Sequence, residues 1–181
     1  MKEFIHLHNH THYSLLDAIS TVDGLVNAAV ENKMSAVALT DHGVMYGAME
    51  FYSKCLSKNI KPIIGFEAYV AQGSSRFDKT KRTESNIDVI DTENSDGLSV
   101  SNINYAHLIL LAKDEAGYRN LLKLNSIGHK EGFYYKPRID LEVLDKHKEG
   151  IIALSACAGG VISCYIVRDN LPKAKEMTGK Y

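Results

Sequence analysis

The residues that could carry chemistry are concentrated near the start of the chain, where four of the eight histidines lie within residues 6–12. The segment Phe4–His8 alternates apolar and polar residues and therefore predicts a first strand. Successive side chains of a strand point to opposite faces. If this geometry continues, His6, His8 and His10 share one face, where neutral imidazole nitrogens can reach a common metal ion. The alternative is a row of solvated or individually hydrogen-bonded histidines.

Further candidate ligands lie in or beside later predicted strands: Asp41, His42, Glu67, His107 and Cys157. In parallel α/β folds the carboxyl ends of the strands form the ligand-binding face. Only His107 departs from this rule, because it opens its predicted strand. Each residue alone has an ordinary explanation: Asp41 can cap a helix, Glu67 can pair with a lysine, and Cys157 can be a buried apolar residue. Together they predict one site.

Histidines, carboxylates and a thiolate suit zinc, manganese or iron better than calcium or magnesium. More than four candidate ligands imply more than one ion. Two metal ions about 4 Å apart suit the hydrolysis of phosphate esters, because one activates a water and the other neutralises phosphoryl oxygens. The sequence contains no glycine-rich phosphate loop, dinucleotide motif or Ser-His-Asp grouping that would favour another chemistry.

The composition is that of an ordinary globular domain, with 181 residues, 45% hydrophobic and 24% charged. The 21 basic and 22 acidic residues provide no extended basic surface, so any nucleic acid must be held locally or by other parts of a larger protein. No apolar run approaches the roughly 20 residues that cross a membrane. The three cysteines form no spaced framework, and we therefore expect a reducing, cytoplasmic location.

Strand and helix patterns alternate five times along the chain. Strands are predicted at 4–8, 35–40, 61–70, 107–112 and 151–154, and helices at 22–33, 46–57, 115–126, 141–146 and 161–167. This alternation predicts parallel strands covered by helices. Thr21 and Asp114 are expected to cap helices, and residues 133–138 are expected to form a link. Residues 72–104 are polar and predict a largely mobile insertion, whose basic residues, Arg76 included, are expected to be solvated.

Three motifs resemble the PHP (polymerase and histidinol phosphatase) domain family: His-Leu-His-Asn-His-Thr at 6–11, Thr-Asp-His-Gly at 40–43, and Gly-Phe-Glu-Ala-Tyr-Val at 65–70. Other segments are similar to the PHP domains that open bacterial replicative DNA polymerase III alpha subunits: 14–17, 75–78, 132–134, 136–140 and 152–157. The resemblance implies a distorted seven-stranded (β/α) barrel, of which about five βα units are present here. It also implies up to three divalent metal ions, with zinc expected first and manganese or iron as alternatives.

By motif, the resemblance assigns metal to His8, His10, Asp17, His42, Glu67, His107 and Cys157. Asp41, His42 and Glu67 are the implied catalytic residues, with Asp41 behind the ligands or an occasional ligand itself. His6 stands where many relatives carry an aspartate. His12 has no implied role, and we expect it to be exposed.

The resemblance implies a metal-dependent phosphoesterase that acts as a 3′–5′ exonuclease beside a DNA polymerase. The alternative is a catalytically silent module that stabilises the polymerase and docks a proofreading subunit. A small histidinol phosphate-type phosphatase is disfavoured by the polymerase-specific segment 136–140. The implied partners are DNA, the other polymerase domains, the sliding clamp and a proofreading subunit, without a membrane. The last PHP ligands and the palm, fingers and thumb are expected beyond residue 181, so residues 1–181 alone are expected to show little nuclease activity.

Overall fold

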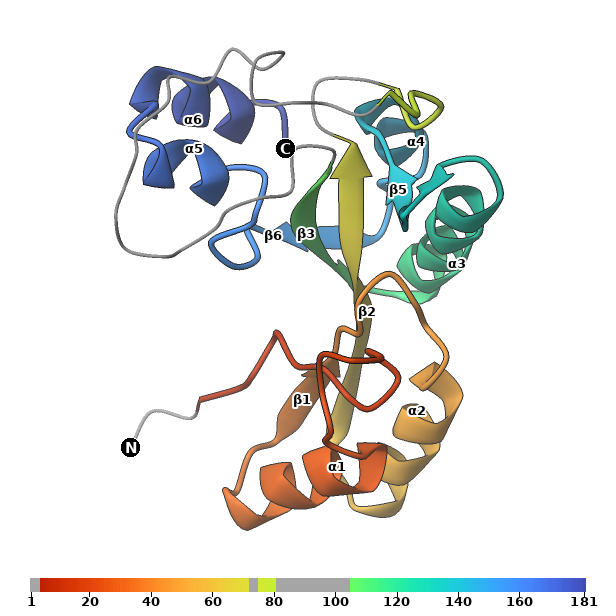
Figure 1. Ribbon diagram of the computed structural model, residues 1–181. Coiled ribbons are helices and arrows are strands. Elements are labelled where there is room, and N and C mark those ends of the chain that lie inside the picture. Colours follow the sequence, from red (N-terminus) through yellow and green to blue (C-terminus); the bar gives the residue numbers. More distant parts are fainter. Residues whose placement is uncertain (1–3, 72–74, 81–104) are drawn as a thin grey trace.

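The computed structural model describes residues 4–71, 75–80 and 105–181 (Figure 1). Its strands are β1 (Ala36–Leu39), β2 (Lys61–Ala71), β3 (Tyr105–Ala112), β4 (Phe133–Tyr134), β5 (Lys136–Ile139) and β6 (Ile151–Leu154). Its helices are α1 (Val22–Glu31), α2 (Ala48–Ser57), α3 (Glu115–Lys130), α4 (Leu141–Lys146), α5 (Ser163–Val167) and α6 (Leu171–Thr178). The predicted α/β class is confirmed. No helix in these ranges is long and apolar enough to cross a membrane.

The long strand β2 organises the sheet, which has the order β4-β5-β2-β3-β6 with β1 also paired to β2. The first residues of β2 pair in parallel with β1, and its far end pairs in parallel with β5. Strand β3 runs antiparallel to β2 along residues 65–71, and β6 runs antiparallel to β3. The sheet is therefore mixed, as Figure 1 shows, and it fits part of a barrel.

The prediction that all strands are parallel is wrong for β3, which runs antiparallel to both of its neighbours, β2 and β6. A parallel neighbour needs a crossover connection, which usually contains a helix. The polar segment between β2 and β3 carries no helical pattern in the sequence. The sequence therefore gave no reason to expect a parallel crossover between these two strands.

Alternation along β2 separates an apolar face from a polar one. Phe66, Ala68 and Val70 point into the main core, which also contains Leu108 and Leu110 of β3, Leu121 and Leu124 of α3, and Ile139 of β5. The residues between them, Glu67 and Tyr69, point to the opposite face because successive strand side chains alternate. Helix α3 thus covers one face of the sheet. The other face carries the candidate ligands beside a small apolar cluster that includes Ile109 and Leu111.

Helices α1 and α2 pack against β1 through a second core that includes Val26, Leu39 and Phe51. The side chain of Thr21 accepts a hydrogen bond from the backbone of Gly24 and caps α1, as predicted. Asp114 caps α3 in the same way, through the backbone of Gly117 (Gly117 lies in the first turn). These caps satisfy backbone N–H groups that have no partner inside a helix.

The predicted first strand at residues 4–8 is not formed. The segment is extended beside β1, where the Ala38 N–H donates to the His6 carbonyl (3.0 Å) and the Thr40 N–H donates to the Asn9 carbonyl (2.9 Å). Three residue steps on the segment therefore match two steps on its neighbour. One extra residue interrupts a regular ladder, as in a β-bulge. His8 and His10 face Glu67, whereas His6, predicted to share their face, is exposed and contacts Phe4.

Residues 133–138 form the β4–β5 hairpin and not a plain link, with Tyr135 at its turn in a left-handed conformation (φ 59°). Arg138 is 2% exposed. Its guanidinium donates hydrogen bonds to the carbonyls of Gly132, Arg76 and Asp78. A buried arginine with three carbonyl acceptors fixes residues 76–78 against the hairpin.

The expectation that Arg76 is solvated is wrong, because the residue is only 8% exposed. Its Nη1 donates to both carboxylate oxygens of Asp140, at 3.2 and 3.1 Å, and its Nε donates to Glu131 at 2.7 Å. Burial of the arginine is tolerated because these two carboxylates neutralise it. The rest of the predicted insertion, 72–74 and 81–104, lies outside the described residues.

Arg76→Ala is expected to lower the free energy of unfolding by about 2–3 kcal/mol, because hydrogen bonds between charged partners contribute on that order. The matched control is Arg119→Ala, which removes an exposed i,i+4 pair with Glu115 and should cost less than about 0.5 kcal/mol. Urea denaturation of both variants measures the difference. Equal losses would contradict the role of Arg76 as a buried anchor.

The decrease in the free energy of unfolding caused by Arg76→Ala should also depend on pH. Burial alone would raise the pKa of Asp140, but hydrogen bonds from the backbones of Arg76 and Val143 and from the Arg76 side chain outweigh it and lower the pKa. A carboxyl whose pKa is lower in the folded state stabilises the fold above its unfolded pKa, and this contribution disappears as the pH falls through the folded pKa. The difference between variant and wild type should therefore shrink below about pH 4.

Candidate metal centre

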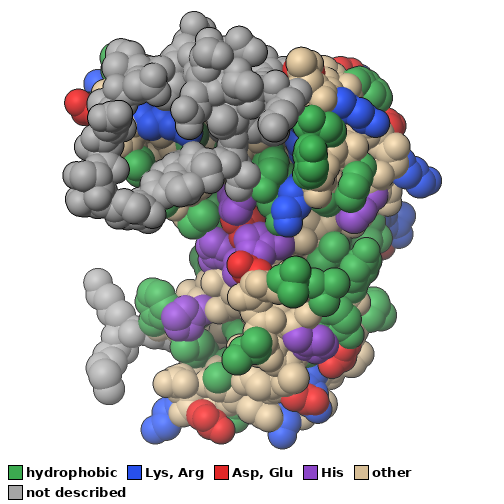
Figure 2. Space-filling model, viewed as in Figure 1, with side chains coloured by type: hydrophobic (Ala, Val, Ile, Leu, Met, Phe, Trp, Pro, Cys, Tyr) green, Lys and Arg blue, Asp and Glu red, His purple; other side chains and the backbone are tan. Residues whose placement is uncertain are grey.

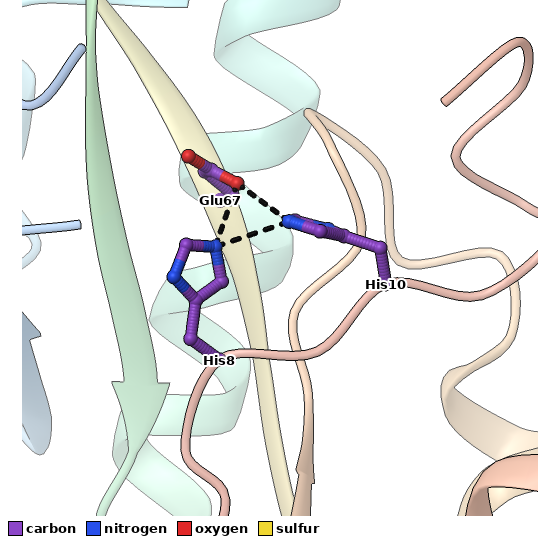
Figure 3. A group of neighbouring side chains, drawn as sticks. All are labelled: His8, His10 and Glu67. Carbon is purple, nitrogen blue, oxygen red and sulfur yellow. Dashed lines mark hydrogen bonds and ion pairs between the residues drawn. The ribbon is translucent and has the colours of Figure 1, made fainter. Parts of the chain in front are cut away.

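The buried carboxylate of Glu67, which is 0% exposed, is surrounded by the side chains of four histidines: His8, His10, His42 and His107. Oxygen Oε2 lies 3.0 Å from the Nε2 atoms of both His8 and His10 (Figure 3). The same oxygen lies 3.2 Å from Nδ1 of His42, and Oε1 lies 2.7 Å from Nδ1 of His107. In Figure 2 histidine and acidic side chains gather near the centre of the face in view.

The strand register explains why His42 and His107 reach Glu67. On one edge of β2, the Glu67 N–H donates to the Asp41 carbonyl (3.0 Å) and the Gly43 N–H donates to the Glu67 carbonyl (2.8 Å), so His42 lies level with Glu67. On the other edge, β3 places His107 opposite Tyr69. Because β3 is antiparallel, its amino end lies beside the carboxyl half of β2. His107 therefore joins the site even though it lies near the start of its strand.

Asp41 holds the amino-terminal segment against the end of β1. Its buried carboxylate accepts hydrogen bonds from the Thr11 N–H (2.6 Å), the Thr11 hydroxyl (2.8 Å) and the Ser14 hydroxyl (2.7 Å). The Ser14 Oγ in turn accepts a hydrogen bond from the backbone N–H of His42 at 3.0 Å. These bonds fix the backbone on both sides of the cluster, directly after His10 and directly before His42. These contacts are those of a positioning residue, which agrees with the place behind the ligands that the resemblance implies for Asp41.

The remaining predicted ligands lie at the margin of the cluster. Asp17 is half exposed, and its Oδ2 lies 2.9 Å from Nε2 of His42. The exposed Cys157 has its Sγ 3.6 Å from Nδ1 of His107. His6 and His12 are both exposed, and their rings contact the neighbouring Phe4 and Tyr13. The structure thus brings six of the seven predicted metal ligands into groups that could hold a metal ion and places the seventh, Cys157, beside His107. His6 and His12 lie outside these groups.

The charge state of the cluster follows from its contacts. Burial alone would raise the pKa of Glu67, but hydrogen bonds with His10, His107 and His8 outweigh it and hold the pKa well below its usual range. Burial lowers the pKa of His42 below its ordinary value, despite the nearby Glu67. Burial also acts to lower the pKa of His10, yet the bond to Glu67 prevails and raises it. The centre therefore offers an ionised carboxylate and, at His42, an imidazole that favours its neutral form.

Among the described residues, the buried His10 Nδ1 has no hydrogen-bond partner. The buried Glu67 Oε1 and His42 Nδ1 have other atoms of the cluster as neighbours, with His107 Nδ1 at 2.7 Å from the first and Glu67 Oε2 at 3.2 Å from the second. Buried polar atoms are nearly always partnered. In addition, the Nε2 atoms of His8 and His10 face one another at 3.0 Å. Lone pairs that converge in this way are the arrangement that a metal ion satisfies. The donor set therefore fits divalent metal.

The PHP domain family profile matches residues 6–181. The chain belongs to the PHP domain family. DNA polymerase III subunit alpha of Aquifex aeolicus is 47% identical over 181 residues, which cover 99% of this chain and 14% of that protein. The same subunit of Borreliella burgdorferi is 45% identical over 172 residues, covering 95% of this chain and 13% of that protein. The chain thus spans about one seventh of the length of these curated relatives.

Among solved structures, an amidohydrolase from Chromobacterium violaceum matches this PHP domain with a TM-score of 0.40 and 18% identity. The match covers 68% of this chain and 33% of the amidohydrolase. A likeness this weak does not define the fold.

Three residues of the centre were not predicted from the sequence. Thr11 and Ser14 bind Asp41, and Tyr69 packs on the cluster with its ring stacked on His42 at 6.0 Å between centroids. A signal for Tyr69 was present, because a residue two positions after Glu67 in a strand shares its face. The hydroxyl residues gave no such signal, since their partner lies 27 to 30 positions away.

Asp41→Asn replaces one accepting oxygen with an NH₂ group that faces the donors of Thr11 and Ser14. We expect the free energy of unfolding to fall by about 1–3 kcal/mol and the metal content to fall with it, because the segment that carries His10 loses its anchor. Metal analysis and denaturation measure the two effects. Asp145→Asn, at an exposed position on α4, should change neither. Full metal content in Asp41→Asn would show that the anchor is dispensable.

Proposed function

We propose that this PHP domain is the metal-dependent phosphoesterase module of a replicative DNA polymerase alpha subunit, and that it removes nucleotides from the 3′ end of a DNA strand. The observation that supports this is the overlap of three possible metal sites: His8, His10 and Glu67; His10, Asp17 and His42; His42, Glu67 and His107. The ligand atoms within each group lie within 4.8 Å of one another. Shared residues suit adjacent ions, which is the arrangement used for phosphate ester hydrolysis.

Zinc is the proposed ion, with manganese or iron as alternatives, and up to three ions are proposed for the complete domain. Imidazole, carboxylate and thiolate donors suit these metals. Bound ions would supply a water of lowered pKa and positive charge for the phosphoryl oxygens. The ionised Glu67 would hold metal from the centre of the cluster, and His42 would present a neutral nitrogen. Asp17 and Cys157 would complete the exposed side, where a substrate can enter.

The proposed partners follow from the relatives, which are subunits of DNA polymerase III. They are DNA, the other domains of an alpha subunit, the sliding clamp and a proofreading subunit.

A structural role is the second candidate, in which metal at Glu67 stabilises the fold and the domain docks a proofreading subunit. It is favoured by the way the cluster connects four segments that are far apart in the sequence. A metal ion that binds only to the folded protein stabilises the folded state.

Removal of metal separates the two candidates. In the full-length protein that carries this domain, chelator treatment should lower the melting temperature, because metal that binds only the folded state stabilises it. It should also abolish nucleotide release from single-stranded DNA, and added zinc or manganese should restore both. Restored stability without nuclease activity would favour the structural candidate. An unchanged melting temperature in protein shown to be metal-free would contradict both.

A second test compares how much two amino-terminal histidines contribute to metal binding and nuclease activity. His8→Ala should lower metal content and nuclease turnover together, because His8 Nε2 lies 3.0 Å from Glu67. His12→Ala is the matched control and should leave both nearly unchanged, since His12 is exposed and contacts Tyr13. Elemental analysis and single-strand nuclease assays provide the comparison. Equal losses in the two variants would show that the cluster at Glu67 is not the metal centre.

A further inference from the structure

Lys136 is a charged residue that neither the fold nor the metal centre explains. Its neighbours in the segment 136–140 have clear roles: Arg138 anchors residues 76–78, and Asp140 binds Arg76 and caps α4. Lys136 is exposed, and no carboxylate in the described ranges lies within 4.0 Å of its ammonium group. Its positive charge is therefore available to a ligand.

The register of β5 directs Lys136 to the face of the sheet that carries the metal centre. Arg138 pairs with Tyr69, and Ile139 pairs with Val70. Ile139 and Val70 both belong to the main core on the other face. Because strand side chains alternate, Lys136 and Arg138 share the face of Tyr69. Figure 2 shows basic side-chain atoms beside the histidine cluster on that face.

The ring of Tyr69 connects Lys136 to the centre. The Lys136 Nζ lies over this ring, 5.3 Å from its centroid, which is within the range of a cation–π contact. The same ring is stacked with His42 at 6.0 Å and meets His107 edge-on at 5.3 Å. Tyr69 is only 4% exposed, so it is held by packing. The ammonium group is thus placed beside the ligands without being one of them.

We propose that Lys136 binds a non-reacting phosphate of a single-stranded polynucleotide while the metal centre holds the phosphodiester that is cleaved. This inference rests on the proposed function and names its substrate class, a strand with at least two phosphates in place of a small phosphomonoester. An ammonium group binds phosphate as a point charge. The formal net charge of the chain is −1, so an anionic strand needs a local cation of this kind.

The test compares two substrates in the full-length protein that carries this domain. One is a short single-stranded oligonucleotide, and the other is the p-nitrophenyl ester of thymidine 5′-monophosphate, which has a single phosphate. Lys136→Ala should raise the KM for the oligonucleotide by about threefold to fivefold, the upper part of the range of an exposed ion pair, with kcat unchanged. Hydrolysis of the ester should not change. Lys136→Arg should restore the KM, and Lys58→Ala, at the exposed end of α2, should match wild type.

An unchanged KM for the oligonucleotide in Lys136→Ala, or an equal loss on both substrates, would overturn the subsite. Oligonucleotide binding gives a readout that does not need turnover. Loss of one phosphate contact should lower the slope of log affinity against log salt by about 0.7 relative to wild type. Equal slopes would overturn the subsite, whatever the nuclease result. A lowered slope in a protein that hydrolyses neither substrate would support the subsite and contradict the proposed nuclease.

Discussion

The burial of one carboxylate, that of Glu67, is the constraint on which the rest of the site depends. An ionised carboxylate removed from water costs several kcal/mol unless it is paired. Here the compensation comes from four imidazoles that are carried by the amino-terminal segment, the end of β1 and strand β3. These segments must meet at the middle of β2 for the charge to be tolerated. The same convergence brings the candidate metal ligands together, so one set of contacts serves both the fold and the candidate metal site.

A second buried carboxylate, Asp41, lies close in sequence to the cluster but has different partners. Its oxygens accept N–H and O–H donors of Thr11 and Ser14, whereas those of Glu67 face ring nitrogens. The hydrogen bonds from Thr11 and Ser14 fix the backbone, whereas the ring nitrogens around Glu67 could coordinate a metal ion. The two acidic residues therefore differ in role: Asp41 orients the segments that carry the histidines, and Glu67 is a candidate metal ligand together with them.

In the β4–β5 hairpin, adjacent residues have different roles because their side chains point to opposite faces of the sheet. Ile139 enters the core, and Arg138 is buried on the other face by three backbone carbonyls. Lys136 lies on that same face but at the exposed end of the strand, against the ring of Tyr69. The anchoring of Arg138 fixes the strand, and the fixed strand places the lysine. The segment 136–140 thus combines a structural arginine with a proposed substrate contact.

Local signals in the sequence determined the α/β class, the caps at Thr21 and Asp114 and most element positions, because caps and periodicity depend on residues within a few positions of one another. Residue chemistry also indicated the set of candidate ligands. Only the tertiary structure decided that β3 is antiparallel, that the first segment carries an extra residue beside β1, and that Arg76 is buried. Strand direction and the burial of a charge depend on partners tens of residues away, such as Asp140 for Arg76, and no local pattern records those partners.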